Sequence, residues 1–351
     1  MTSIKYHFIL YIMKNIINTI EEKKKRLDIY RPLPKEQVAN LEEWFKVELT
    51  YNSNAIEGNT LDRDETALVV EKGITIEGKT IREHLEAINH AEALDYLKDL
   101  VNEKREQLTE RDILQIHWLV LKKIDDENAG KYRRVAVKIS GNDLVLPDPI
   151  KVPELMTEFI KWLTGKNVDY PIKIVADAHF KLVTIHPFID GNGRTARLLM
   201  DLLLMQYGYP PAIIKKEERR VYIESLNKGQ TTGDLADFYN FIYTTVERSL
   251  DIYLDLLEPS EKVEKVEEKG VVAAKRLLKI GELAKESGEA ISTIRFWAQE
   301  GLFDIADYTA GGYMLFDQSM IERAKMIRKL QEDERLTISE IKEKLTNGKN
   351  L

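Results

Sequence analysis

The sequence predicts a mainly α-helical protein with one small β-hairpin and a separate, smaller helical domain at its C-terminus. In most long segments apolar residues recur at helical spacing. Two short β-like runs, Val135–Ile139 and Leu144–Leu146, flank Ser140–Asp143, a pattern typical of a hairpin. The segment Glu258–Gly270 is highly charged and lacks core-forming residues, and a new pattern begins at Leu277. We therefore expect an N-terminal helical region over 1–100, a helical core over 101–257, a charged linker over 258–274 and a C-terminal domain over 275–351.

The helical segments follow one another with short connections. An apolar run at Tyr6–Met13 is too short to span a bilayer and is expected to form a first helix. The run Thr195–Tyr207 is so apolar that we expect it to be a central, buried helix. The other expected helices of the core and N-terminal region are Glu36–Asn54, Arg82–Leu100, Thr109–Ile124, Val152–Leu163, Pro171–Thr184, Lys216–Lys228 and Ala236–Leu256.

Composition limits the classes of function. Hydrophobic residues make up 43% of the chain and charged residues 32%, which suits packed cores with a well-solvated surface. The net charge of −7 provides no overall basic field that would attract DNA or anionic lipid. The chain has no cysteine, which excludes disulfides and thiolate metal sites. We expect a cytoplasmic protein without a membrane segment.

One stretch, His186–Arg197, reads HPFIDGNGRTAR and combines several chemical groups. Gly191 and Gly193 let backbone N–H groups approach an anion, and a helix that begins just after them favours negative charge at its N-terminus. Arg194 and Arg197 share a helix face, and guanidinium groups match phosphate oxygens. Asp190 is an oxygen ligand suited to Mg²⁺ that bridges phosphates. His186 can accept a proton near neutral pH.

Simpler interpretations of these residues exist. A lone histidine is usually a structural residue, and Arg197 could pair with Asp201 on the same helix. The stretch GNGRTA imitates a dinucleotide-binding fingerprint, but that fingerprint requires a preceding strand, and the preceding segment is helical. The other histidines show no metal-ligand spacing and are expected to be structural or on the surface: His7, His84, His90, His117 and His179.

The stretch HPFIDGNGRTAR resembles the signature of the Fic family of protein AMP-transferases, and the similarity covers about Leu41–Leu256. GKYRRVAV at 130–137 is similar to the start of the family's substrate-aligning flap. LLMDLLLMQYGYPPAII after the signature is similar to animal Fic enzymes that act on endoplasmic-reticulum chaperones.

The resemblance implies roles for individual residues. His186 would deprotonate the target hydroxyl, and Asp190 would hold Mg²⁺ on the α- and β-phosphates of ATP. The remaining implied nucleotide contacts are Gly191, Asn192 and Gly193 around the β-phosphate, Arg194 at the α- and β-phosphates, Arg197 at the γ-phosphate and Tyr222 at adenine.

The segment Ser53–Gly58 reads SNAIEG and is expected to end a helix, with Gly58 after its last turn. It resembles the inhibitory motif of the Fic family. The resemblance implies that Ser53, Glu57 and Gly58 form a brake in which Glu57 pairs with Arg197 and occupies the place of the γ-phosphate. Some such enzymes also remove AMP.

The C-terminal segment Leu278–Phe303 has helix-turn-helix spacing, with helices expected at Ile280–Glu286 and Ile291–Gln299 and a small wing at Tyr308–Phe316. IGELAKESG, STIRFWAQEGLF and GGYMLF resemble the MerR-type winged helix family. The residues expected to face a DNA groove are Ser292, Thr293 and Arg295. Lys275–Leu351 holds 13 basic and 13 acidic residues, and Met314 stands where the family usually has arginine, so a docking or dimerisation role stays open.

We therefore expect an autoinhibited enzyme that moves AMP from ATP, with Mg²⁺, to a Ser, Thr or Tyr hydroxyl of a target protein and of itself. A homodimer is expected, and DNA is a candidate ligand of the C-terminal domain. The alternatives are a DNA-binding transcriptional regulator whose Fic domain senses nucleotide, and a Fic enzyme with another phosphodiester donor such as UTP or CDP-choline. The intact His186 favours an enzyme, because sensing needs no base.

Overall fold

The computed structural model describes residues 2–138, 144–166, 169–258, 277–308, 314–334 and 336–347. The chain divides into two compact units. The first comprises Met1–Ile29 and Phe45–Ile252, and the second comprises Tyr30–Trp44 and Tyr253–Leu351. The linker expected at 258–274 lies outside the described residues except for Glu258. Among the described residues no helix combines the length and apolarity needed to cross a membrane.

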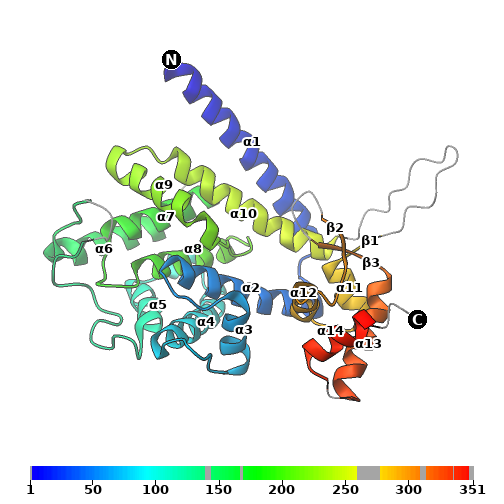
Figure 1. Ribbon diagram of the computed structural model, residues 1–351. Helices are drawn as coiled ribbons and strands as arrows, with labels where there is room; N and C mark the ends of the chain where they lie inside the picture. The colour runs from blue at the N-terminus through cyan, green and yellow to red at the C-terminus, as the bar shows by residue number, and fades with distance from the viewer. Residues whose placement is uncertain are drawn as a thin grey trace. The chain divides into compact units, whose positions relative to one another are not determined.

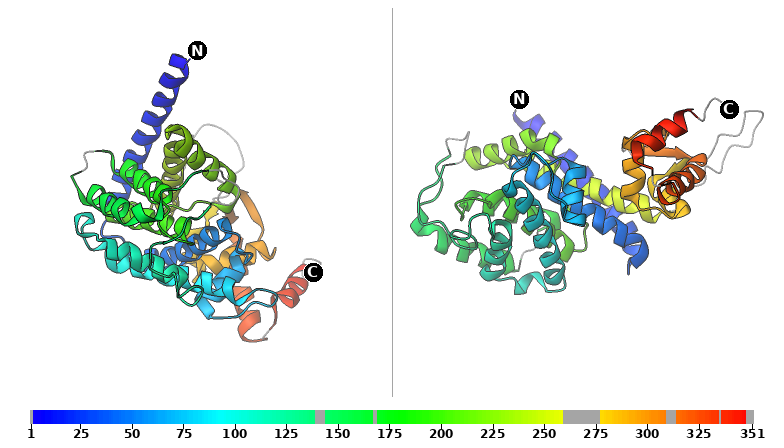
Figure 2. Two further views of the ribbon diagram at one scale, coloured as in Figure 1. Left: turned by 90° about the vertical axis from the view of Figure 1, so that its left-hand side faces the viewer. Right: turned by 60° about the horizontal axis from the view of Figure 1, so that its bottom comes forward.

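The first unit is helical (Figure 1). The central helix is α8, which spans Asn192–Gln206 and buries every side chain from Arg194 to Leu204. This confirms the prediction of a central apolar helix after the motif. Helices α4, α5 and α7 all pack against α8, and the two views of Figure 2 show the same bundle from other directions.

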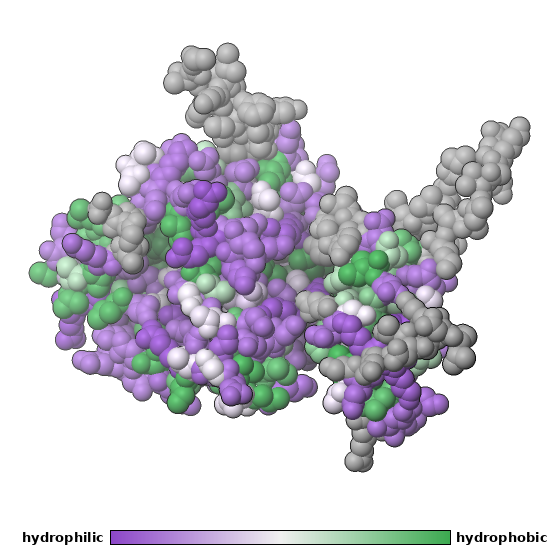
Figure 3. Space-filling view, in the orientation of Figure 1, coloured by the Kyte–Doolittle hydropathy of each residue, from purple (hydrophilic) through white to green (hydrophobic). Residues whose placement is uncertain are grey.

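Most other helices of this unit lie close to the predicted ranges, but the first helix extends well beyond the expected Tyr6–Met13. Their bounds are α1 Thr2–Ile29, α4 Ile81–Val101, α5 Glu110–Leu121, α6 Val152–Thr164, α7 Pro171–Ile185, α9 Arg219–Thr232 and α10 Ala236–Leu257. Helix α2, Lys35–Ile56, is divided between the two units, as is the end of α10. Polar residues cover most of the visible face of these helices (Figure 3), as the charged composition leads one to expect.

A short helix that was not predicted, α3, spans Arg63–Lys72. Asp62 accepts a hydrogen bond from the backbone of Glu65, whose side chain accepts one from the backbone of Asp62, so a capping box begins the helix. Gly73 ends it in a left-handed conformation, with φ of 65°.

The hairpin expected at Val135–Leu146 is not formed by paired strands in the described residues. Residues 135–138 and 144–146 carry no strand ladder, and the expected turn at 140–143 lies outside the described part of the chain. The guanidinium of Arg133 binds both ends of this loop at its base. It donates to the carbonyl oxygens of Val135, at 3.2 Å, and Pro147, at 2.7 Å.

The second unit contains the helix-turn-helix pair and a three-stranded antiparallel sheet. Its elements are β1 Leu277–Lys279, α11 Ile280–Ser287, α12 Ile291–Gln299, β2 Ile305–Tyr308, β3 Met314–Asp317, α13 Ser319–Glu332 and α14 Ile338–Asn347. The strand order is β1-β3-β2. The two helices α11 and α12 match the predicted pair, while residues 309–313 of the expected wing lie outside the described residues.

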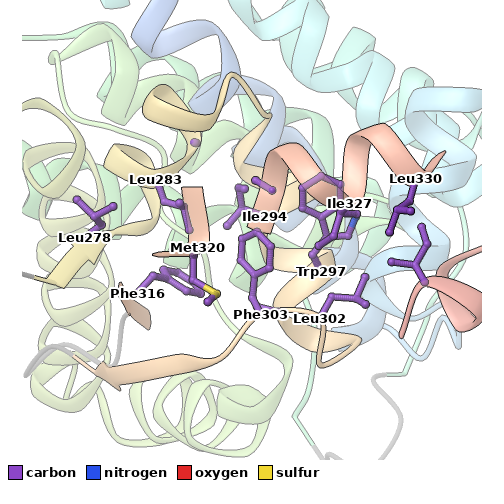
Figure 4. Close-up of a cluster of buried hydrophobic side chains, with 14 residues drawn as sticks. Leu278, Leu283, Ile294, Trp297, Leu302, Phe303, Phe316, Met320, Ile327 and Leu330 are labelled. Carbon is purple, nitrogen blue, oxygen red and sulfur yellow. The ribbon is translucent and has the colours of Figure 1, made fainter. Parts of the chain in front are cut away.

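The core of the second unit gathers aromatic and aliphatic side chains from α11, α12, α13, α14 and the sheet (Figure 4). Trp297 of α12 is 1% exposed and packs against Phe303, with ring centroids 5.6 Å apart. Phe303 in turn meets Phe316 of β3 edge to face. Burial of each such ring contributes about 1.5–3 kcal/mol, which makes this cluster the main source of the unit's stability.

Candidate active site

The site forms where α7 ends and α8 begins. Helix α7 ends at Ile185. His186 follows it in a left-handed conformation, with φ of 52°, and Pro187 comes next. Gly191, with φ of 77°, precedes α8. The side chain of Asn192, the first residue of α8, closes the turn that joins the two helices. It accepts from the backbone N–H of Phe188 and donates to the carbonyl of Phe188, each at 2.9 Å. The side chain of Asn192 is therefore used to close this turn, and only its backbone N–H is left to face a nucleotide.

A buried histidine of α5 supports the turn from beneath. The ring of His117 stacks on Phe188, with centroids 3.6 Å apart. Its Nδ1 accepts from the N–H of Gly130 at 3.0 Å, so its Nε2 carries the proton and donates to the carbonyl of Asp190 at 3.0 Å. Burial lowers the pKa of His117 to about 4, which keeps the ring neutral. Sequence reasoning assigned His117 no role in the site, because none of these partners is close to it in sequence.

His186 is half-buried and suited to act as a base. Its Nδ1 lies 3.3 Å from the carbonyl oxygen of Val183. Since a carbonyl only accepts, this contact places the proton on Nδ1 and leaves the lone pair on Nε2. Burial lowers the pKa of His186 below its ordinary value, partly opposed by the bond to Val183, so the imidazole is neutral at neutral pH.

Arg133 connects His186 to the loop over 135–147. Its Nε donates to the carbonyl oxygen of His186 at 2.8 Å, and its backbone N–H donates to Pro187 at 2.9 Å. The same guanidinium holds Val135 and Pro147, as described above. The base of the loop is therefore fixed next to the candidate base.

The start of α8 forms an anion site. The first N–H groups of a helix have no partner within it, and here they follow Gly191 and include Gly193. Arg194 is 3% exposed, and its Nε and Nη1 have no hydrogen-bond partner among the described residues. Its nearest anions are Glu86, at 3.3 Å from Nη1, and Asp190, at 3.6 Å from Nη2. A buried guanidinium with open donors fits a phosphate.

Asp190 lies beside this anion site and is half-exposed. One carboxylate oxygen, Oδ1, accepts from the N–H of Gly191 at 2.6 Å. The other, Oδ2, pairs with Arg82 at 3.0 Å. No group of three or more potential metal-ligating side chains occurs in the described ranges. Mg²⁺ in nucleotide sites is often bound by a single carboxylate, with phosphate and water oxygens as its other ligands. Asp190 fits this role once the side chain of Arg82 moves away from Oδ2.

Arg197 and Glu57 form the pair that the sequence predicts. Arg197 is 4% exposed, and its Nη2 donates to Oε1 of Glu57 at 2.7 Å. The same guanidinium donates to the side chain and the carbonyl of Ser53, both at 2.9 Å. Gly58, with φ of 101°, lets the chain turn away directly after Glu57. The carboxylate of Glu57 lies against Gly193, within the candidate anion site.

Tyr222 does not take the position expected for an adenine contact. Its side chain is 1% exposed, and its hydroxyl lies 2.8 Å from Nε2 of His179. Burial raises the pKa of Tyr222 to about 12, opposed by the nearby Arg197. Tyr222 is therefore a core residue in this structure, because α9 turns it inward toward α7 rather than toward an open surface.

Comparisons with known proteins show which family this chain is similar to. Residues 107–204 match the model of the Fic/DOC family. A protein adenylyltransferase Fic from Nematostella vectensis is 43% identical over 206 residues, which are 58% of this chain and 48% of that protein. The one from Drosophila grimshawi is 40% identical over 246 residues, 68% of this chain and 50% of that protein. The solved structure of Fic-1 (aa134–508) from C. elegans is 32% identical, with a TM-score of 0.65 and a match over 71% of this chain and 74% of that one. The chain belongs to the Fic family.

This Fic chain spans about half the length of the curated relatives it matches. The Fic/DOC match contains the whole motif from His186 to Arg197 and begins after the turn that carries Glu57. Residues 278–348 match a second model, that of the MerR HTH family regulatory proteins.

The residues of the Fic chain's second unit that are expected to face DNA all lie on α12. The side chain of Ser292 lies outside what the structure describes, and Thr293 is half-buried. The guanidinium of Arg295 lies over the ring of Trp44, 4.8 Å from its centroid. Arg295 is therefore engaged in a cation–π contact within its own unit rather than pointing into solvent.

Proposed function

We propose that this chain transfers AMP from ATP to a Ser, Thr or Tyr hydroxyl of a protein, including its own, and that Glu57 inhibits the transfer. The observation that carries the proposal is the pairing of Glu57 with Arg197 directly against Gly193, at the start of α8. A carboxylate seated in an anion site has the charge of a phosphate and competes with it.

In the transfer, the hydroxyl oxygen of the target attacks the α-phosphorus of ATP while the bond from that phosphorus to the bridging oxygen of pyrophosphate breaks. Nε2 of His186 accepts the hydroxyl proton. Arg194 and the N–H groups at the start of α8 neutralise the negative charge on the phosphates. Mg²⁺ held at Asp190 would supply further positive charge to the phosphates. The chain contributes mainly positioning of the hydroxyl and stabilisation of charge.

Glu57 opposes this geometry because it occupies the side of Arg197 that a γ-phosphate needs. With Glu57 in place, ATP would bind weakly or with its phosphates bent away from the in-line arrangement. Removal of AMP from a modified target is a further proposal that the family resemblance supports. A homodimer and a cytoplasmic location are also proposals, the latter resting on the absence of cysteine from the sequence.

The test is the Glu57→Gly variant. We expect it to label itself or a lysate protein faster than wild type when it is given α-labelled ATP, with an unchanged circular dichroism spectrum. Arg197→Ala in the same background should cancel the gain, because both effects depend on one guanidinium. Mass spectrometry of the labelled proteins would identify the added AMP and the acceptor residue. A folded Glu57→Gly variant that binds ATP but labels nothing faster than wild type would refute the proposal.

A second candidate function is DNA binding by the second unit. The α11–α12 pair, the small antiparallel sheet and the MerR family match support it. The contact between Arg295 and Trp44 opposes it, as does the balance of charges in Lys275–Leu351.

A gel-shift selection with random duplexes at low salt tests this second function. We expect enriched sequences, binding that weakens steeply with salt, and tighter binding by Trp44→Ala, which releases Arg295. An absence of any enriched sequence for both proteins would favour a protein-docking role for this unit.

A further inference from the structure

The turn that carries Glu57 is bracketed by two asparagines. The carbonyl oxygen of Asn54 accepts from the backbone N–H groups of Glu57, at 3.0 Å, and Asn59, at 3.1 Å. These bonds close the turn in which Glu57 leaves the end of α2. They fix the shape of the turn, but they do not attach it to the rest of the unit.

Both asparagine side chains attach the turn to α4. Nδ2 of Asn54 donates to the carbonyl of Glu86 at 3.1 Å. Nδ2 of Asn59 donates to the carbonyl of Glu83 at 3.1 Å and to the carboxylate of Glu86 at 2.9 Å. The turn is thus held by hydrogen bonds on both sides of Glu57.

The carboxylate of Glu86 faces the turn with one oxygen and the phosphate-binding side with the other. Oε2 accepts from Asn59, while Oε1 lies 3.3 Å from both Nη1 of Arg194 and Nε of Arg82. The side chain of Glu86 is only 12% exposed, so solvent screens these contacts weakly. A single acidic side chain therefore touches both the turn of Glu57 and the first arginine of the motif.

The side chain of Glu57 is itself 39% exposed, and its pair with Arg197 needs support. A half-exposed carboxylate on a glycine-terminated turn can leave its partner through rotation of its own side chain or through movement of the turn. The bonds to α4 oppose movement of the turn.

We propose that Asn59 and Glu86 form a latch that holds the inhibitory turn against α4 and so positions Glu57 on Arg197. This inference rests on the proposed function, in which Glu57 is the inhibitor. Asn59 is a positioning residue, since its side chain bonds to α4 and to the N–H of Leu61 rather than to Arg197 or His186. Asn59 is a cleaner site for a test than Glu86, because Glu86 also faces Arg194.

The test compares Asn59→Ala in the wild-type chain and in the Glu57→Gly chain, by the rate of labelling with α-labelled ATP. The substitution removes the two hydrogen bonds to α4 and the one that Oδ1 of Asn59 accepts from the N–H of Leu61. This should weaken the latch enough to raise labelling about two- to tenfold while Glu57 is present. The same substitution should not raise the rate of Glu57→Gly, because there the inhibitor is already gone. A purely structural role would only lower activity in both backgrounds.

Two further variants, Asn59→Asp as a second test and Asn89→Ala as a control, complete the experiment. Asn59→Asp keeps the size of the side chain but places a negative charge against Glu86, so it should raise the labelling rate at least as much as Asn59→Ala. It serves as the second test of the latch in case Asn59→Ala folds poorly. Asn89 also lies on α4, and its side chain donates to the carbonyls of Val120 and Lys122 rather than to the turn. Asn89→Ala should therefore remove the bonds to Val120 and Lys122 while the bonds between α4 and the turn remain, so the labelling rate should not rise.

The outcomes are distinct. A rise with Asn59→Ala or Asn59→Asp that disappears in the Glu57→Gly background supports the latch. Folded Asn59 variants that label at the wild-type rate, while Glu57→Gly labels faster, would overturn the latch and leave the proposed function standing. An equal rise with Asn89→Ala would also overturn it. Absence of labelling by Glu57→Gly would overturn the proposed function, and the latch with it.

Discussion

Gly193 and Glu57 are packed so closely that residue 193 has no room for a side chain. A Cβ atom built on Gly193 would lie 2.4 Å from Oε1 of Glu57 and 3.1 Å from Nη1 of Arg197. The helix itself would accept alanine, whose helix propensity is about 1 kcal/mol better than that of glycine. Glycine is therefore needed at position 193 to leave room for the neighbouring group. That group is the carboxylate of Glu57 in this structure and would be a phosphate when ATP is bound.

We expect Gly193→Ala to have opposite effects in two backgrounds. In the wild-type chain the methyl group should push the flexible Glu57 side chain off Arg197, and labelling with α-labelled ATP should rise, though less than in Glu57→Gly. In the Glu57→Gly chain the same methyl group should slow labelling, because it intrudes on the phosphate site. Rates that change in the same direction in both chains would contradict this account of Gly193.

His186→Ala in the Glu57→Gly background should lower the rate of AMP transfer about 10²–10⁴-fold. Binding of ATP, measured by calorimetry, should be largely retained, because His186 makes no contact that the phosphates require. Labelling at an undiminished rate would remove His186 from the mechanism.

The pH profile of the Glu57→Gly enzyme should follow the protonation of His186. The transfer needs the neutral imidazole, and burial lowers the pKa of His186. The rate should therefore stay high as pH falls to the ordinary histidine value of about 6.5 and decline only below it. A midpoint clearly above that value would be inconsistent with the buried, neutral His186 of this structure.

Substitutions at Asp190 and Arg82 should affect the requirement for Mg²⁺ in opposite ways. Asp190→Ala should remove most activity and make the remainder insensitive to a chelator. Arg82→Ala should free Oδ2 of Asp190 and lower the Mg²⁺ concentration needed for half-maximal rate. The effect should be at most about fivefold, because the Arg82 side chain is 59% exposed and exposed ion pairs are weak. Titration of Mg²⁺ measures both, and an unchanged requirement in both variants would exclude Asp190 as the ligand.

Asp201→Asn should change how stability depends on pH. Burial raises the pKa of Asp201 to about 8, opposed by the N–H of Ala212 and by Arg197, whereas the unfolded carboxyl has its ordinary value near 3.8. Between these two pKa values the folded state holds a proton that the unfolded state has lost. The contribution of Asp201 to the free energy of unfolding is therefore full below about pH 4 and is lost as pH rises toward 8. The amide of the substituted side chain can still accept from Ala212 but does not titrate.

The free energy of unfolding of Asp201→Asn relative to wild type should therefore increase between pH 5 and 8, by up to about 1.4 kcal/mol per pH unit. Urea denaturation at several pH values measures the difference. A constant difference across this range would show that Asp201 stays ionised in the folded chain.

The sequence predicts most of the helices because their apolar faces are long and regular. It misses α3, which is short and polar, although the capping residues Asp62 and Glu65 and the terminal Gly73 mark both its ends. The hairpin predicted at Val135–Leu146 has no strand ladder in the described residues 135–138 and 144–146, and residues 139–143 lie outside them. At the base of this segment the guanidinium of Arg133 donates to the carbonyl oxygens of Val135 and Pro147.

The motif from His186 to Arg197 is predictable because its chemistry lies within one continuous stretch. The contacts that surround it are not, since His117 reaches Asp190 and Asn59 reaches Glu86 from distant segments, which leave no local pattern. Residue type alone leaves the side-chain partners of Asn192 and Tyr222 open. Each has a residue type suited to a nucleotide, but their side chains are committed to Phe188 and His179.

The anchoring of the loop over 135–147 through Arg133 has a consequence for engineering. Because a single guanidinium gathers the carbonyls of Val135, Pro147 and His186, the two ends of the loop are held through backbone atoms and not through their side chains. The segment between those ends should accept grafted sequences, including insertions, as long as Arg133 is retained. Libraries built there could redirect the enzyme to new acceptor proteins without rebuilding its catalytic centre, in the way that antibody loops are exchanged on a constant framework.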